Sequence, residues 1–476
     1  MGQPIKKLKT NFAARSFAGF VELAFSLFTF PYVAKILAPT SIGEIDYVNA
    51  TVSIFITMGA LGVAEYGARE VAQNKSETEK VDSILSRLLG FRLLVGAALF
   101  LVYIGFVVPF YGNSSTLFYI SSLLILTSAF NTVWALEAIE DFTFLAWSRF
   151  FSKIGFLAYI LYFVKSEKDM INYFLAILIF DFVYFIFAVI RLKYSFAISF
   201  SFKKLFQKIS KDELTMLIRL FAVTLIQSTI TSIPSMIMGK LNFFRELGLL
   251  STAFRFFWIG YYALIPLSTV LLSRSISFSF NTNSSERLAH LDRAADSLFT
   301  LSIPIAVGMF CIADNAISLL VGTDYAGSIF LLQALSPLIV IFAFNNFWSM
   351  QVVYSAKGDR ALIISNSIAL LAAIILSVVL IPLYQALGGV LTYLGTYSML
   401  LTISYFYGRS HYSMKNISPE ILKSFLAGVG MFLVVYNLPG ADYLHLGFKI
   451  LAGAIVYGIL LLLFRHKLLR RVLKFK

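Results

Sequence analysis

The sequence is poor in charge and in cysteine. Only 13% of its 476 residues are charged and 59% are hydrophobic, whereas a soluble domain carries roughly a quarter charged residues. This composition excludes a water-soluble fold, because such a fold could not cover so much apolar surface. The single cysteine, Cys311, excludes an internal disulfide, and we expect it to be a small core residue without a redox role.

The sequence also lacks the clusters that carry chemistry. Its four histidines, at positions 290, 411, 445 and 466, fall outside the predicted membrane spans. No group of Cys, His and carboxylate residues has metal-ligand spacing, and no glycine-rich phosphate loop follows a strand. We therefore expect no catalytic residue, no metal and no cofactor. The net charge of +14 does not indicate a nucleic-acid partner, because the basic residues lie at the ends of apolar blocks.

Long apolar blocks dominate the chain, with 48 Phe and 24 Tyr among them. Blocks of roughly 20 residues predict spanning helices rather than the short alternating strands of a membrane barrel. We expect an uncleaved first span, since no small-residue cleavage site follows it. The fold class predicted is an all-α polytopic membrane protein with about fourteen spans, near 12–37, 45–64, 86–109, 117–137, 142–164, 170–190, 215–239, 248–273, 297–320, 329–354, 362–383, 389–408, 421–438 and 447–464.

The distribution of positive charge predicts the orientation. With a cytoplasmic N-terminus, only Lys165, Lys168, Lys240 and Arg245 fall in segments assigned to the outside, although the chain has 39 Lys and Arg residues. This bias places both termini in the cytoplasm. The predicted division is a first six-helix lobe, a basic cytoplasmic linker, a second six-helix lobe, and two further helices with a basic tail: 1–190, 191–214, 215–408 and 409–476. The linker cations either rest on anionic headgroups or only set the topology.

Two prolines recur at matching places in the two lobes. Pro31 precedes Ile42-Gly43, and Pro234 precedes Leu247-Gly248 at nearly the same spacing. The match predicts a parallel repeat, in which a substrate site lies between lobes near the bilayer midplane. Each proline is expected to bend or break its helix and to act as a gating element.

Two carboxylates stand inside predicted spans, where a charge is unfavourable and needs a partner or a proton. Asp181 lies at the centre of the sixth span, and either couples transport to an ion or forms a structural salt bridge. Glu22 lies in the first span, seven residues after Arg15, so that both fall on one helix face. We expect that face to be a helix contact or a cavity wall.

Cations come from several predicted spans. Arg92, Arg219 and Arg255 stand in the third, seventh and eighth spans, and Lys153 in the fifth. A guanidinium group suits phosphate because its fork of donors binds two oxygens. Arg15 and Arg219 lie near the cytoplasmic end and are equally well explained by snorkelling. The set predicts a positively lined cavity for an anionic substrate, in which Arg255 is the cation least easily explained by snorkelling.

Several motifs resemble those of a known family. Residues 30–73 are similar to the opening of Wzx-type polysaccharide flippases, which carry Pro-Tyr, Arg-x-Leu-Gly-Pro and later Leu-Gly. Lys35 replaces the Arg, Ala38-Pro39 replaces Gly-Pro, and Gly43 and Leu61-Gly62 match. Later segments also match in order and spacing: WALEAIEDF (134–142), LGLLSTAFR (247–255), VGTDYAGSIFLLQALSP (321–337), Gln351, AKGDR (356–360) and IPLYQALGGVLTY (381–393).

The resemblance implies membership of the multidrug/oligosaccharidyl-lipid/polysaccharide (MOP) exporter superfamily and a place in the bacterial inner membrane. The implied substrate is a glycan linked to undecaprenyl diphosphate, flipped to the outer leaflet for O-antigen, capsule or exopolysaccharide synthesis. H⁺ or Na⁺ and polysaccharide assembly proteins are the further partners expected. The alternatives are a MATE-like drug/cation antiporter, a flippase for a peptidoglycan precursor and, more remotely, a membrane polymerase, ligase or acyltransferase.

Overall fold

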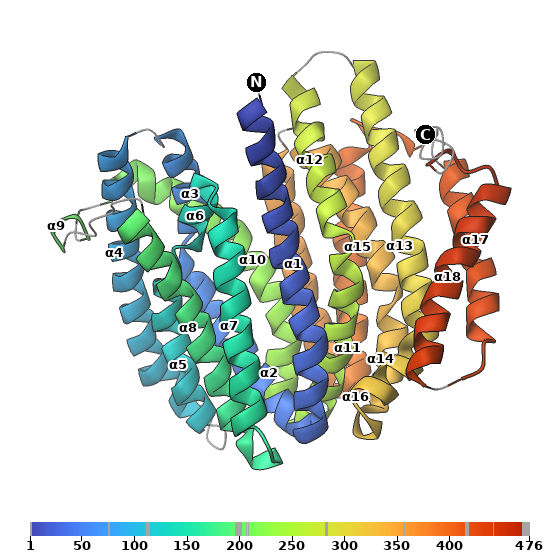
Figure 1. Ribbon diagram of the computed structural model, residues 1–476, viewed down its shortest axis with the longest axis horizontal. Helices are drawn as coiled ribbons and strands as arrows, with labels where there is room; N and C mark the ends of the chain where they lie inside the picture. The colour runs from blue at the N-terminus through green and yellow to red at the C-terminus, as the bar shows by residue number, and fades with distance from the viewer. Residues whose placement is uncertain are drawn as a thin grey trace. The chain divides into compact units, whose positions relative to one another are not determined.

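The computed structural model describes most of the chain, and every regular element in the described part is a helix (Figure 1). The described residues are 2–74, 77–110, 115–195, 202–205, 207, 209–280, 284–356, 358–414, 418–440 and 442–468. The chain divides into two compact units, Met1–Ser232 and Ile233–Lys476. The all-α membrane architecture predicted from the sequence is confirmed.

The first unit contains the helices from α1 to α9 and the part of α10 that ends at Ser232. Their bounds are α1 (Gly2–Ile36), α2 (Pro39–Ala60), α3 (Val63–Gln73), α4 (Thr78–Val102), η1 (Tyr103–Val107), α5 (Ser115–Ala129), α6 (Val133–Ile139), α7 (Phe142–Phe163), η3 (Glu167–Asp169), α8 (Met170–Ser195), α9 (Phe202–Leu205) and α10 (Lys211–Lys240). The boundary between the units falls inside α10.

The second unit contains the end of α10 and the remaining helices. Their bounds are α11 (Phe244–Tyr262), α12 (Ile265–Phe280), α13 (Ser284–Leu320), η4 (Thr323–Tyr325), α14 (Gly327–Leu335), α15 (Pro337–Asn346), η5 (Phe347–Tyr354), α16 (Asp359–Gly408), α17 (Ser418–Tyr436) and α18 (Tyr443–Leu463). Its core includes two clusters of buried apolar residues, one around Phe299 and Trp348 and the other around Met431 and Tyr457.

Twelve helical segments of the described residues are long and apolar enough to cross a membrane. The pair α11 and α12, bent by 46°, adds a thirteenth. Long helix α16 contains a residue with non-helical backbone, Gln385 (φ 51°, ψ −121°), which divides it into two stretches, 359–384 and 386–408. Counted as two spans, these stretches correspond to the predicted spans 362–383 and 389–408, and the total becomes the fourteen expected from the sequence.

The Leu61-Gly62 pair forms a sharp break between α2 and α3. Both residues have a left-handed backbone, with φ of 44° and 67°. A Cβ on Gly62 would stand 2.8 Å from the carbonyl oxygen of Leu217 in α10. Glycine is therefore required here twice, for its backbone conformation and for the close approach of another helix.

The break in α16 also depends on glycine. A Cβ on Gly388 would lie 2.3 Å from the carbonyl oxygen of Leu380. The residue Pro382, between the two, removes a backbone donor and prevents a regular helix from continuing. The segment 381–393, which carries part of the family resemblance, is thus the point at which one predicted span ends and the next begins.

Several sequence expectations need correction. The predicted spans end at 273 and resume at 297, but α12 continues to Phe280 and α13 begins at Ser284, while residues 281–283 lie outside the described part. Polar residues on a helix extending past the apolar block explain the difference. Neither Pro31 nor Pro234 breaks its helix, because α1 and α10 continue through them. The bend expected at each proline and the gating role stay predictions.

Two cations of the basic linker form ion pairs with carboxylates of the first unit. Arg191 Nε lies 2.7 Å from Asp141 Oδ2, and Lys204 is paired with Asp82 of α4. These carboxylates neutralise two of the linker cations that were assigned either to headgroups or to topology alone. The linker is therefore tied to the cytoplasmic ends predicted for the first-unit helices.

Candidate functional site

A charged cluster lies inside the first unit, where helices α1, α7 and α8 pack side by side (Figure 1). Arg149 Nε of α7 donates to Glu22 Oε2 of α1 at 2.8 Å. Lys153 Nζ, one turn further along α7, is 3.0 Å from the other carboxylate oxygen, Oε1. The Glu22 carboxylate therefore bridges two cations, one with each of its oxygens.

The third helix adds an acid and an aromatic ring. Asp181 Oδ1 of α8 is 3.5 Å from Arg149 Nη1, at the limit of a hydrogen bond. The guanidinium carbon of Arg149 lies 4.8 Å from the centroid of the Tyr184 ring. Arg149 is thus held from two sides by carboxylates and from a third by a π face. The cluster comprises Glu22, Arg149, Lys153, Asp181 and Tyr184, and this name is kept below.

The cluster is well inside the predicted bilayer. Arg149 and Lys153 are seven and eleven residues from the first residue of α7, Phe142, which places them about 10 and 16 Å along the helix axis. A charged side chain at such a depth is rare and faces protein or a wet cavity. The pairing of four charges, two of each sign, makes the insertion of all three helices tolerable.

The cluster is not sealed. The side chains of Glu22 and Asp181 are 39% and 43% exposed, against 24% for Arg149 and 22% for Lys153. The two acids are therefore more exposed than the two cations that they pair with.

Close packing fixes the three helices around the cluster. Ser152 Oγ of α7 donates to the Phe180 carbonyl of α8 at 2.6 Å. A Cβ on Gly155 would stand 2.4 Å from the Phe180 ring, so the two helices approach closely at this point. On the other side of α7, the rings of Phe25 and Phe150 meet edge to face at 6.2 Å. These contacts hold the three helices close together around the charged side chains.

The structure brings together three of the residues singled out in the sequence, Glu22, Lys153 and Asp181. Arg149 was missed, although it occupies a detectable position. It precedes Lys153 by four residues, a spacing that puts both side chains on one helix face. Two cations on one face of an otherwise apolar span were the signal that could have identified it.

Arg92 has a different environment from the one expected of a cavity cation. Its side chain is 5% exposed, and its two terminal nitrogens donate to the carbonyl oxygens of Ser128 and Asn131, each at 2.7 Å. These carbonyls belong to the C-terminal end of α5, where helix carbonyls lack partners within the helix. The position suits a guanidinium cap for a helix end.

The other predicted cations lie apart from the cluster. Arg219 is exposed on α10 and lines a pocket of about 430 Å³ together with Asp212 and Thr215. Arg255 is half-buried on α11 of the second unit. Arg15 lies in α1, and its side chain is outside the described part. Their roles in substrate binding stay predictions.

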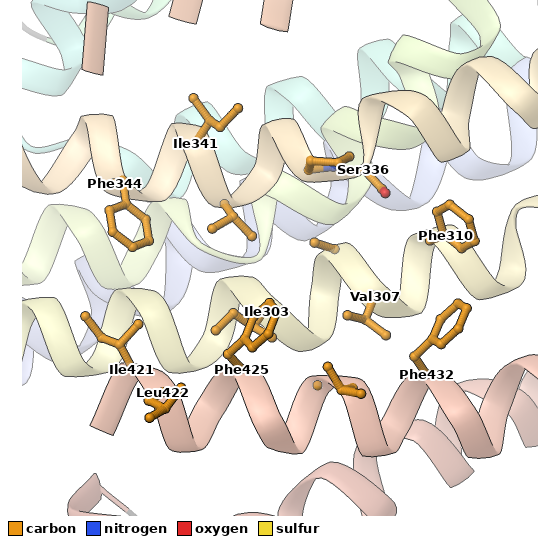
Figure 2. Close-up of a pocket in the computed structure, with 15 residues that line it drawn as sticks. Ile303, Val307, Phe310, Ser336, Ile341, Phe344, Ile421, Leu422, Phe425 and Phe432 are labelled. Carbon is orange, nitrogen blue, oxygen red and sulfur yellow. The ribbon is translucent and has the colours of Figure 1, made fainter. Parts of the chain in front are cut away.

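The described part of the second unit contains two largely apolar pockets. One pocket of about 780 Å³ lies between α13, α15 and α17, and its lining includes Phe310, Phe344, Phe425 and Phe432 (Figure 2). Ser336 is the single polar residue in that lining. Within a bilayer, such a surface accommodates a hydrocarbon or isoprenoid chain and offers nothing to an anion.

A second pocket, of about 570 Å³, contains one cation, Lys449 of α18. Its ammonium group is buried and donates to Asn315 Oδ1 at 2.8 Å. Asn315 Nδ2 in turn donates to the Gly440 carbonyl at 2.9 Å. Lys449 is therefore an anchored charge that links α18 to α13, and Asn315 links α13 to the segment before α18.

Two histidines occupy positions that the sequence did not predict. His290 is 3% exposed within α13, and His466, just beyond α18, is 0% exposed. His466 Nε2 is 3.1 Å from Ser424 Oγ and 3.6 Å from Glu420 Oε2. The expectation that all histidines lie outside the spans is wrong for His290 and His445, which lie within the candidate spans Ser285–Leu320 and Tyr443–Leu463. No group of His, Cys and carboxylates suited to a metal ion occurs among the described residues.

A family model described as "Polysaccharide biosynthesis protein" matches residues 8–282. The chain belongs to this family. The match covers the whole charged cluster and more than half of the chain, and it confirms the resemblance to polysaccharide flippases at the level of the family. No curated protein matches the chain in sequence.

Solved transporter structures of the MOP superfamily share the fold. A structure titled lipid II flippase MurJ, inward closed conformation, aligns with a TM-score of 0.76 and 19% identity over 97% of this chain and 99% of that chain. An inward-facing multidrug resistance MATE family transporter aligns with a TM-score of 0.65 and 14% identity, over 83% of this chain and 94% of that chain. A MOP superfamily transporter from Pyrococcus furiosus aligns with a TM-score of 0.55 and 12% identity, over 85% of this chain and 93% of that chain. At these identities the likeness establishes the fold, a multi-pass membrane transporter fold.

Proposed function

We propose that the protein is a flippase for a lipid-linked glycan. The substrate is an oligosaccharide carried on undecaprenyl diphosphate, and it moves from the cytoplasmic to the outer leaflet of the bacterial inner membrane. The two units alternate access to the two sides, with both termini in the cytoplasm. Membership of a polysaccharide biosynthesis family and the MOP transporter fold support this function.

One observation carries the proposal: two cations stand about 10 and 16 Å along a spanning helix, held at fixed positions. A flippase for this substrate must bring a diphosphate through the bilayer, where an unpaired anion is strongly disfavoured. Arg149 supplies a planar fork for two phosphate oxygens, and Lys153 supplies a compact charge one turn away. We assign the diphosphate to this pair.

The remaining parts of the substrate need different surroundings. The glycan would pass through the polar interior of the transporter, and the isoprenoid chain would stay in contact with lipid. The apolar pocket between α13, α15 and α17 (Figure 2) is a surface on which such a chain could lie. Arg255, in the second unit, stays a predicted contact for the anionic part of the substrate.

The proposal is tested by export in cells that depend on this protein for surface polysaccharide. Arg149→Gln and Lys153→Gln should each lower surface polysaccharide and raise the lipid-linked intermediate, and the double variant should abolish export at an unchanged protein level. Lys168→Gln, outside the cluster in the loop before α8, is the matched control. Arg255→Ala tests the second unit in the same way. Normal export by the double variant would contradict the assignment of the diphosphate to the cluster.

The same cells separate the remaining candidates. A flippase for a peptidoglycan precursor binds the same diphosphate chemistry, but its depletion would accumulate that precursor and lyse the cells. A drug/cation antiporter would change drug resistance and leave polysaccharide unaffected. Either outcome would replace the proposed substrate, while the fold would stand.

A further inference from the structure

The Glu22 carboxylate contacts both Arg149 and Lys153, the two cations to which the proposed function assigns the substrate diphosphate. Each of its carboxylate oxygens contacts one of them, at 2.8 Å from Arg149 Nε and 3.0 Å from Lys153 Nζ. The bridging position is the one that a phosphate oxygen pair would take, since carboxylates and phosphates use the same guanidinium and ammonium donors. The site is therefore filled by an anion belonging to the protein itself.

The charges of the cluster cancel. Two acids, Glu22 and Asp181, face two bases, Arg149 and Lys153, so the formal sum is zero. A diphosphate entering this neutral cluster would leave uncompensated negative charge at bilayer depth, which is strongly disfavoured. Either the anion does not bind, or the cluster acquires a positive charge when it does.

Of the two acids, Glu22 is the one that must leave the cations before a diphosphate can bind both of them. Its two carboxylate oxygens contact both cations, Arg149 Nε at 2.8 Å and Lys153 Nζ at 3.0 Å, and its side chain is 39% exposed. Asp181 forms an ion pair with Arg149, at 3.5 Å, whereas Glu22 forms one with each of the two cations. An incoming anion therefore has to displace Glu22 to reach the pair.

We propose that Glu22 is an exchangeable counter-anion: the substrate diphosphate displaces it from Arg149 and Lys153, and the released carboxylate binds one proton. The inference rests on the proposed function, because it uses the same cation pair. The proton comes from water, the Glu22 carboxylate becomes a neutral carboxyl group, and no bond of the substrate is made or broken. When the anion leaves, the proton leaves with it and Glu22 returns to the two cations.

The surroundings of Glu22 favour a proton over a metal cation. The groups that face it from the packed helices are Arg149 and Lys153 on α7 and Asp181 and Tyr184 on α8. Asp181 is the only other carboxylate among them, whereas hard metal cations need several oxygen ligands. A neutral carboxyl group needs no such shell. The exchange thus links the uptake of one proton to each anion bound.

The test measures binding of inorganic pyrophosphate to the full-length protein in detergent or nanodiscs by isothermal titration calorimetry. Repeating the titration in buffers of different ionisation enthalpy counts the protons taken up. We expect the wild type to take up about one proton per pyrophosphate bound. We expect Glu22→Gln to bind about ten-fold tighter, a change of about 1.4 kcal/mol, with little proton uptake. Glu44→Gln, on α2 outside the cluster, is the control and should behave as the wild type.

Two further variants keep the result interpretable. Arg149→Gln/Lys153→Gln, added to Glu22→Gln, should remove the gain and so exclude binding at the basic loops. Glu22→Asp, whose shorter side chain cannot bridge both cations, covers the case in which Glu22→Gln fails to fold; it should bind pyrophosphate more tightly than the wild type and still take up a proton.

Each failure has its own signature. Equal affinity in the wild type, Glu22→Gln and Glu22→Asp, without proton uptake, overturns the exchange and leaves the cation pair as the substrate site. Absence of pyrophosphate binding in the wild type and in both variants overturns the cation pair itself and, with it, the main support of the proposed function. Pyrophosphate binding that depends on Na⁺ and takes up no proton also overturns the proposed protonation of Glu22.

Discussion

Gly67 of α3 lies directly against the indole ring of Trp134 in α6. A Cβ on Gly67 would stand 2.4 Å from both Cη2 and Cζ3 of the ring. The two residues come from separate segments that carry the family resemblance, 30–73 and 134–142. Some of the residues that carry the resemblance therefore pack against each other. Their contact holds the short helices α3 and α6 together in the core of the first unit.

Gly67→Ala should lower the stability of the first unit, because the new methyl group has no space beside Trp134. Overpacking of this kind costs about 1–3 kcal/mol. The measurement is the thermal midpoint of the purified protein in detergent. Gly105→Ala is the control, since a Cβ at Gly105 would meet nothing within 4 Å. Equal midpoints for the two variants would show that α3 and α6 can move apart without loss.

Arg92→Ala should destabilise the protein without weakening anion binding. The change removes both donors from the Ser128 and Asn131 carbonyls, and losing hydrogen bonds to a charged group costs about 1.5–3 kcal/mol each. We expect a lower thermal midpoint and an unchanged pyrophosphate affinity in the folded fraction. Arg92→Lys should recover only part of the stability, because one ammonium group cannot follow the geometry of the fork. A normal midpoint with lost pyrophosphate binding would return Arg92 to the substrate site.

Asn315→Leu should destabilise the second unit, because it leaves the Lys449 ammonium group buried without its acceptor. Removal of one partner from a buried charged contact costs about 3–5 kcal/mol. Lys449→Met removes the charge and fits the apolar pocket around it, so the double variant should be more stable than Asn315→Leu alone. Thermal midpoints of the three variants and the wild type give the coupling between the two residues. Additive effects would show that the contact between them contributes nothing.

The sequence predicted the spans well because hydropathy and helix length are local properties. It found the break near Gln385 as a boundary between two spans, since Pro382 and the glycines after it are local signals too. The partners of the charged residues are not local. Arg92 and Arg149 are both arginines within apolar spans, yet one caps α5 and the other faces Glu22 and Asp181. The partner of each arginine lies 32 to 127 residues away along the chain. Which partner it meets is therefore set by the packing of the helices.

Tyr184 is expected to position the Arg149 guanidinium group through its ring. The ring centroid lies 4.8 Å from the guanidinium carbon, and such a contact contributes about 0.5–2 kcal/mol. Tyr184→Leu removes the π face and should weaken pyrophosphate binding about five-fold, the equivalent of about 1 kcal/mol. Tyr184→Phe keeps the aromatic face and should bind pyrophosphate as the wild type does. If Tyr184 only filled volume, the Phe and Leu variants would bind alike. If Phe weakened binding as much as Leu, the phenolic hydroxyl would be the group that matters, and the ring would have no part in orienting Arg149.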